Sequence, residues 1–102
     1  MIRVVAVITA NPGRRDELFA AFQGNAPKVR AERGCVEYRP FIDAEGFGTR
    51  QAKMGSDALV ILEEWEDAEA LKAHMTAPHM IAYAERTKDL VAGRAIHILS
   101  PM

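Results

Sequence analysis

A lone tryptophan and two histidines lie close together in the sequence, and their side chains could carry chemistry. Trp65 is followed by His74 and His79, which lie on either side of Pro78. The histidines are five residues apart, unlike the i, i+4 pair of a helical metal site, so we expect no metal. A neutral imidazole can instead act as a general base. His79 is the first candidate, because it opens a helix after Pro78, where the helix dipole favours an uncharged ring. His74 is equally compatible with a structural role.

Three further side chains could belong to the same site. Trp65 shares a strand face with Ile61, so it either fills the core or forms the wall of a pocket. Glu63 lies on that face as well, where a buried carboxylate would need a partner; a place near the solvated strand end is the simpler interpretation. Asn25 falls on the apolar face of a predicted helix, so its amide must bond either to backbone or to a ligand.

The hydrophobic periodicity predicts elements in the order β-α-β-β-α-β. The expected strands are 2–10, 35–43, 59–65 and 94–99, and the expected helices are 12–33 and 67–93, the latter interrupted at Pro78. Asn11 and Asp67 are the expected caps of the two helices, and Gly93 is the expected end of the second. Residues 44–57 form a long, glycine-containing connection.

This order predicts an α+β, ferredoxin-like fold, with a four-stranded antiparallel sheet and helices on one face. The strands are apolar on both faces; Val5 and Val7, for example, lie opposite the other apolar residues of their strand. A chain of this length has no second layer to cover both faces. The simplest prediction is a homodimer in which two sheets pack face to face.

In the second strand, alternation places Cys35 and Tyr38 on opposite faces, and Pro40 indicates an edge strand or a bulge. Cys35 is the only cysteine, which excludes an internal disulfide and a thiolate metal cluster. A half-buried apolar role suits it better than a catalytic one.

The bulk properties exclude several classes of function. The 102 residues suit one domain, 1–102. The net charge of −1 comes without a basic stripe, so nucleic acid is not an expected partner. No apolar run approaches the roughly 20 residues of a membrane span. The first residues alternate as a strand and lack a signal-peptide cleavage site, so we expect a mature cytoplasmic protein.

Five short motifs give the chain a family resemblance. They are Asn11-Pro12-Gly13-Arg14, Asn25-Ala26, Glu32-Arg33-Gly34-Cys35, Glu63 to Asp67, and His74 to His79. In this order the chain resembles the antibiotic biosynthesis monooxygenase family over nearly its whole length. Members form dimeric α+β barrels. Some oxidise quinols or polyketide anthrones with dioxygen and no bound flavin, haem or metal.

The resemblance implies a cofactor-independent monooxygenase that acts on a quinol-like or polyketide-derived aromatic. His79 would remove a proton from the substrate, Asn25 would stabilise the oxyanion, and Trp65 would stack on the ring. The expected substrate-binding residues are Phe22, Glu63, His74 and Tyr83. The expected partners are the aromatic substrate, dioxygen and a second copy of the chain.

Two alternatives remain open on the same scaffold. The family resembles an isomerase of a phosphorylated signal molecule, and haem-degrading relatives. A basic cluster at the pocket mouth would favour an isomerase acting on an enolisable, phosphorylated ketone; its candidates are Arg50, Lys53 and Arg86. A filled pocket would favour a non-catalytic dimeric binding protein; the side chains able to fill it are Phe22, Met75, Met80 and Tyr83.

Overall fold

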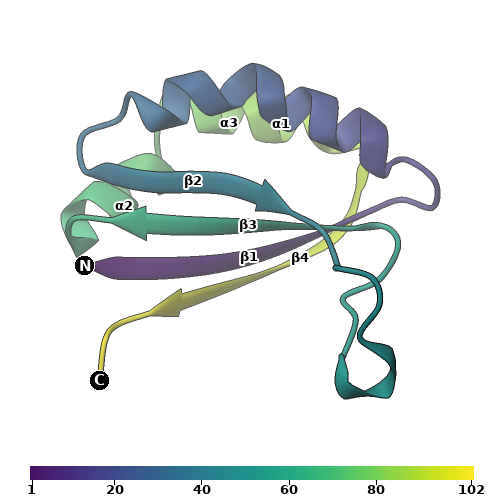
Figure 1. Ribbon diagram of the computed structural model, residues 1–102. Helices are drawn as coiled ribbons and strands as arrows, with labels where there is room; N and C mark the ends of the chain where they lie inside the picture. The colour runs from purple at the N-terminus through teal and green to yellow at the C-terminus, as the bar shows by residue number, and fades with distance from the viewer.

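The computed structural model describes all residues, 1–102, as one sheet with helices on one side (Figure 1). The strands are β1 (Ile2–Ala10), β2 (Cys35–Phe41), β3 (Ala58–Trp65) and β4 (Val91–Leu99), and the helices are α1 (Arg15–Arg30), α2 (Ala68–Met75) and α3 (Pro78–Thr87). The strand order is β2-β3-β1-β4, and every pairing is antiparallel. The predicted ferredoxin-like α+β fold is thereby confirmed.

Helix α1 buries the face that the periodicity indicated. Leu18, Phe22, Asn25 and Val29 are all buried, and Pro27 lies inside the helix without ending it. The predicted cap at Asn11 is wrong: the helix begins at Arg15. Asn11 instead donates its side-chain amide to the Asp89 carbonyl at 2.8 Å. The amide therefore ties the start of α1 to the segment before β4 rather than to its own helix.

The second helical region divides at Pro78, as predicted. Asp67 caps α2 by accepting from the Ala70 amide at 2.8 Å, and Pro78 is the first residue of α3. The predicted end at Gly93 is wrong, because α3 stops at Thr87 and Gly93 lies within β4, opposite Thr9. The long β1 offers pairing along its whole length, and this pairing outweighs the weak helical pattern of the last residues.

Strand β2 is an edge strand with an irregular register, which agrees with the prediction from Pro40. The register shifts between Cys35 and Glu37. This bulge reverses the side-chain alternation, so Cys35 and Tyr38 both pack on the core. The predicted placement of these two residues on opposite faces is therefore wrong.

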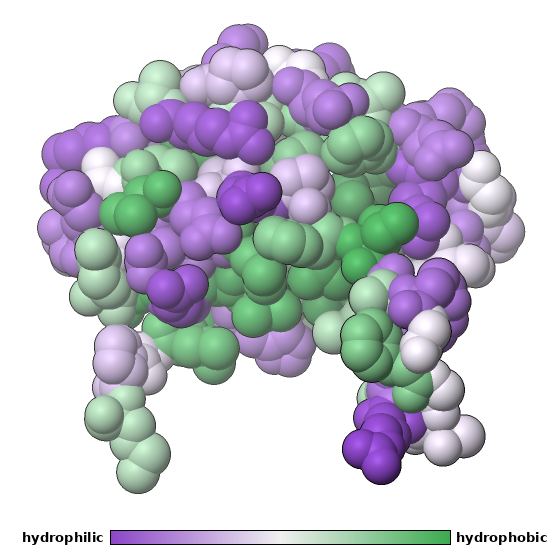
Figure 2. Space-filling view, in the orientation of Figure 1, coloured by the Kyte–Doolittle hydropathy of each residue, from purple (hydrophilic) through white to green (hydrophobic).

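The face of the sheet without helices is also apolar near its centre. Its cross-strand neighbours are Val5 with Leu62 and Val7 with Val60. Figure 2 shows apolar side chains gathered over the strands, between the C-terminal segment and the 44–57 connection. That connection holds one short 3-10 turn, Gly48–Arg50, and projects away from the helices (Figure 1).

Candidate functional site

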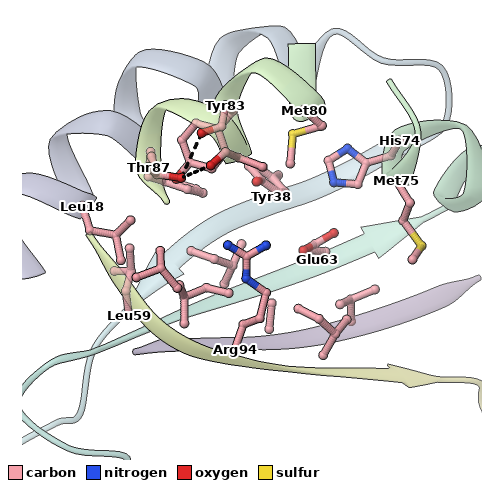
Figure 3. A pocket seen from close by; sticks show the side chains of 18 of the residues that line it. Leu18, Tyr38, Leu59, Glu63, His74, Met75, Met80, Tyr83, Thr87 and Arg94 are labelled. Carbon is pink, nitrogen blue, oxygen red and sulfur yellow. Dashed lines mark hydrogen bonds between the residues drawn. The ribbon is translucent and has the colours of Figure 1, made fainter. Parts of the chain in front are cut away.

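A cavity of about 310 Å³ lies between the helix-covered face of the sheet and helices α2 and α3. Its walls are mainly apolar and aromatic, and they come from all four strands and from all three helices. The residues outside these classes are Glu63, His74, Thr87 and Arg94. Figure 3 shows His74, Met80 and Tyr83 on the helix side, with Glu63 and Arg94 on the sheet side. A volume of this order accommodates a small aromatic molecule.

His74 is held by a carboxylate that the sequence analysis did not single out. Its Nδ1 lies 2.8 Å from Oε2 of Glu32, in the turn between α1 and β2. A carboxylate only accepts hydrogen bonds, so Nδ1 carries the proton and Nε2 is the basic nitrogen. Because Glu32 does not line the cavity whereas His74 does, Nε2 is the nitrogen left for a ligand.

His79 shares this carboxylate but does not line the cavity. Its Nε2 lies 3.2 Å from the same Oε2 of Glu32. Its Nδ1 is buried and has no hydrogen-bond partner. The two histidines are therefore joined through one oxygen atom, and only His74 faces the cavity.

Aromatic rings fix the position of His74 from the other side. The Trp65 ring lies 4.7 Å from the His74 ring, and Tyr38 meets His74 edge-on at 5.7 Å. Phe22 stacks on Tyr38 at 5.1 Å. Trp65 is wholly buried and lies behind His74, outside the cavity lining. These rings restrict the imidazole to one orientation.

Glu63 is buried, with only 7% of its surface exposed. The predicted place near the solvated strand end is therefore wrong. Oε1 of Glu63 accepts the indole N–H of Trp65 at 3.0 Å. Burial raises the pKa of Glu63, although the Trp65 hydrogen bond and nearby His74 act in the opposite direction. The carboxyl group lines the cavity beside His74. Its raised pKa favours the protonated form more than in an exposed glutamate.

Asn25 lies at the edge of this arrangement. Its Nδ2 approaches the Met80 sulfur at 3.4 Å, a weak interaction, and its Oδ1 is buried without a partner. Asn25 does not line the cavity itself, whereas Met80 does. The amide thus carries an unused acceptor directly behind the cavity wall.

The structure brings together only some of the residues that the sequence suggested. Phe22, Glu63, His74 and Tyr83 line the cavity, whereas Asn25, Trp65 and His79 lie behind its wall. Glu32, Tyr38 and Arg94 were missed. Glu32 belongs to one of the family motifs, so the sequence did contain a signal that could have identified it. Tyr38 was hidden by the bulge in β2.

The features that would favour the two alternatives are not found in the cavity. Arg50, Lys53 and Arg86 do not line it; Lys53 pairs with Glu45, and Arg86 lies over the Tyr83 ring. Phe22, Met75, Met80 and Tyr83 line the cavity without filling it. Nor does any group of three His, Cys, Asp or Glu side chains converge in a metal-ligand arrangement.

Comparison with known proteins decides the family. The family model described as antibiotic biosynthesis monooxygenase matches residues 1–86. The chain belongs to the antibiotic biosynthesis monooxygenase family. It is 37% identical to the Escherichia coli protein named "probable quinol monooxygenase YgiN", over 99% of this chain and 98% of YgiN.

Solved structures share the fold of this chain. The crystal structure of PA3566 from Pseudomonas aeruginosa is 25% identical, with a TM-score of 0.80 over 99% of this chain and 93% of PA3566. The structure of Rv0793 from Mycobacterium tuberculosis is 26% identical, with a TM-score of 0.79 over 99% and 94% of the two chains. None of the helices here is both long and apolar enough to span a membrane.

Proposed function

We propose that this family member is a cofactor-independent monooxygenase that oxidises a quinol-like aromatic with dioxygen. The observation that carries the proposal is the Glu32–His74 pair, which presents a basic imidazole nitrogen to an apolar cavity. The 37% identity to a protein named a quinol monooxygenase supports the same reaction class.

In the proposed reaction, Nε2 of His74 removes a proton from a hydroxyl group of the substrate. The resulting anion gives one electron to dioxygen, and the radical pair combines to form a carbon–oxygen bond. The peroxide takes the proton back and then eliminates water with the hydrogen of the same ring carbon, so one oxygen atom stays on the ring as a carbonyl oxygen and the other leaves as water. Apolar walls favour this chemistry, because they exclude solvent from the anion and the radicals.

Glu32 would position His74 and connect it to His79. A carboxylate that accepts from Nδ1 fixes the tautomer in which Nε2 is basic. The side-chain exposures rise from 7% at His74 to 16% at Glu32 and 22% at His79. Glu32 therefore links the histidine that lines the cavity to the more exposed of the two histidines. The assignment of His79 as the base remains a prediction. The activities of the His74→Ala and His79→Ala variants distinguish it from the assignment of His74.

The test is oxygen uptake by metal-free protein with a panel of hydroquinones and anthrones. We expect His74→Ala to lose about 10²–10⁴-fold in rate, the usual contribution of a general base. Glu32→Gln should lose less, because a neutral amide still holds the ring. His79→Ala should keep most of the activity. Loss on His79→Ala with activity retained in His74→Ala would make His79 the base. If no substrate is oxidised faster by the wild type than by His74→Ala, the proposal fails.

We also propose that two copies of the chain associate through the open face of the sheet. Val5, Val7, Val60 and Leu62 form an apolar centre there, and no helix covers it. Burial of this face against a second copy would remove apolar surface from water. Sedimentation at micromolar concentration should give a dimer, and Val7→Lys should give a folded monomer. A monomeric wild type would contradict the proposal.

A further inference from the structure

Arg94 is an exposed residue that adds a positive charge to the lining of the apolar cavity. It lies on β4 opposite Ile8, so its side chain shares the helix-covered face of the sheet. It lines the cavity, and no other lysine or arginine does. Figure 3 shows the guanidinium rising from β4 toward Tyr83 of α3. Its charge is close enough to Tyr83 to oppose the rise that burial causes in the pKa of that phenol.

No acidic side chain neutralises this guanidinium. Arg3, Arg14 and Arg33 each have a carboxylate partner. Arg30 donates to the Tyr38 carbonyl instead. The Arg94 side chain makes no ion pair or hydrogen bond with the chain, and the residue is exposed to solvent. A planar fork of donors that has no acceptor within the chain and borders an apolar cavity is suited to bind an anion.

Glu63 does not serve as that acceptor. It shares the cavity with Arg94, but no ion pair joins them. His74 acts to lower the pKa of Glu63, and Arg94 acts to lower the pKa of Tyr83. The polar groups of the lining thus form two pairs, the His74–Glu63 end and the Arg94–Tyr83 end. Apolar side chains such as Ile61 and Ile96 lie among the lining.

We propose that the cavity takes a hydroxylated aromatic carboxylate, with the carboxylate on Arg94 and a ring hydroxyl at the His74–Glu63 end. The identity of the reacting hydroxyl rests on the proposed function; the selection for an anion rests on Arg94 alone. A guanidinium binds a carboxylate through two parallel hydrogen bonds, which also orient the ring.

Calorimetric titration under nitrogen tests the selection without turnover. The probes are 6-hydroxy-2-naphthoate and its methyl ester, which have the same ring and hydroxyl but differ in charge. The wild type should bind the acid at least 10-fold more tightly than the ester. Arg94→Gln should lose that preference while its affinity for the ester stays within about 2-fold. Arg94→Lys should retain part of it, because the charge remains and the fork is lost.

Arg86→Gln is the matched control, since it removes the same charge from a residue that lies over Tyr83 but outside the cavity lining. It should keep the full preference for the acid. Equal affinity of the wild type for both probes, binding of neither, or the same loss in Arg86→Gln as in Arg94→Gln would each overturn the inference. Thermal unfolding of each variant checks that the fold is intact.

The titration and the oxygen-uptake assay can fail separately. Preference for the acid without any oxygen uptake would refute the monooxygenase and leave the anion site standing. The opposite result is oxygen uptake on neutral hydroquinones together with equal binding of the acid and the ester. That result would refute the anion site at Arg94 and leave the monooxygenase standing.

Discussion

The helix-covered face of the sheet has a closed half and an open half. In the closed half, β2 and β3 lie against α1 and α2, and Tyr38 and Trp65 are buried there. In the open half, β4 carries Ile96 and Ile98 on the same face, yet these side chains remain 48% and 51% exposed. The cavity extends across both halves, with Tyr38 and His74 lining it from the closed half and Arg94, Ile96 and Ile98 from the open half.

The difference separates the group that must stay fixed from the space that must stay empty. His74 belongs to the closed half, where rings and the Glu32 carboxylate restrict it. Arg94 belongs to the open half and has no partner to restrict it. Such a division allows the basic nitrogen to be preorganised while the ligand end of the cavity adapts to different substituents.

The largest contrast should appear when one apolar side chain is shortened in each half. Trp65→Ala should destabilise the fold by about 3–5 kcal/mol, because it leaves a large void in a dense core. Ile96→Ala should change stability by about 1 kcal/mol or less, since half of that side chain is already in water. Urea unfolding measures both.

If Trp65→Ala does not fold, Trp65→Phe serves instead. That change keeps a ring but leaves Glu63 without its indole donor, and it should destabilise by about 1–3 kcal/mol. An Ile96→Ala loss as large as that of the tryptophan variant would mean that β4 is covered in solution, and the contrast between the halves would be lost.

The second contrast uses two glycines with left-handed backbone. Gly34 has φ +81°, and a Cβ there would lie 2.6 Å from the Cβ of Ala70 in α2. Gly13 has φ +77° with nothing within 4 Å. Gly34→Ala should therefore destabilise by about 2–5 kcal/mol, from backbone strain plus overpacking. Gly13→Ala should lose only the strain, about 1–2 kcal/mol.

Both values come from thermal or urea unfolding at one pH. Equal losses would show that α2 moves away easily from the turn that carries Glu32, and the closed half would then be less rigid than its packing indicates.

The third test concerns Asn25, whose Oδ1 is buried without a partner. Asn25→Leu has a similar volume and removes this unpaired acceptor, so stability should stay level or rise by up to about 1–2 kcal/mol. Oxygen uptake should nevertheless fall if the amide supports the reaction, as the sequence analysis predicts. A clear loss of stability would instead assign Asn25 a structural hydrogen bond.

The smallest expected effect is the pH dependence contributed by Glu63. Its folded-state pKa lies above the ordinary value of 4.5, because burial disfavours the charge. The folded state therefore binds the proton more tightly than the unfolded chain, and stability should decline as the pH rises above about 4.5 toward the raised pKa. Glu63→Gln should remove this decline and be the more stable form at pH 8. The same slope in both proteins, in urea unfolding at pH 5 and pH 8, would show that Glu63 is solvated.

The sequence predicted the fold well because local patterns govern it. The buried face of α1, the division of the second helical region at Pro78 and the cap at Asp67 all follow from short-range rules. The misses at Asn11 and Gly93 involve long-range partners. Asn11 bonds to a residue 78 positions away, and Gly93 is drawn into pairing with β1. Neither partner is visible in a window of neighbouring residues.

The site was less predictable, since it depends on which side chains converge. The spacing of His74 and His79 could not show that Glu32 bridges them from the turn after another helix. One extra residue in the β2 bulge turned Tyr38 toward His74. The alternation of β4 predicts the face on which Arg94 lies. That this face borders a cavity is evident only from the structure.

The connection between β2 and β3 has a practical consequence for engineering. Asp43 accepts from the amides of both Met54 and Gly55 at 2.9 Å, so the two ends of the loop are fastened together. The ten residues between them contribute nothing to the cavity lining. A peptide tag, a fluorescent reporter or new chain termini placed among residues 44–53 should therefore leave strand register and ligand binding intact. In evolution, the same fastening would let this segment lengthen and diverge while the rest of the domain stays under constraint.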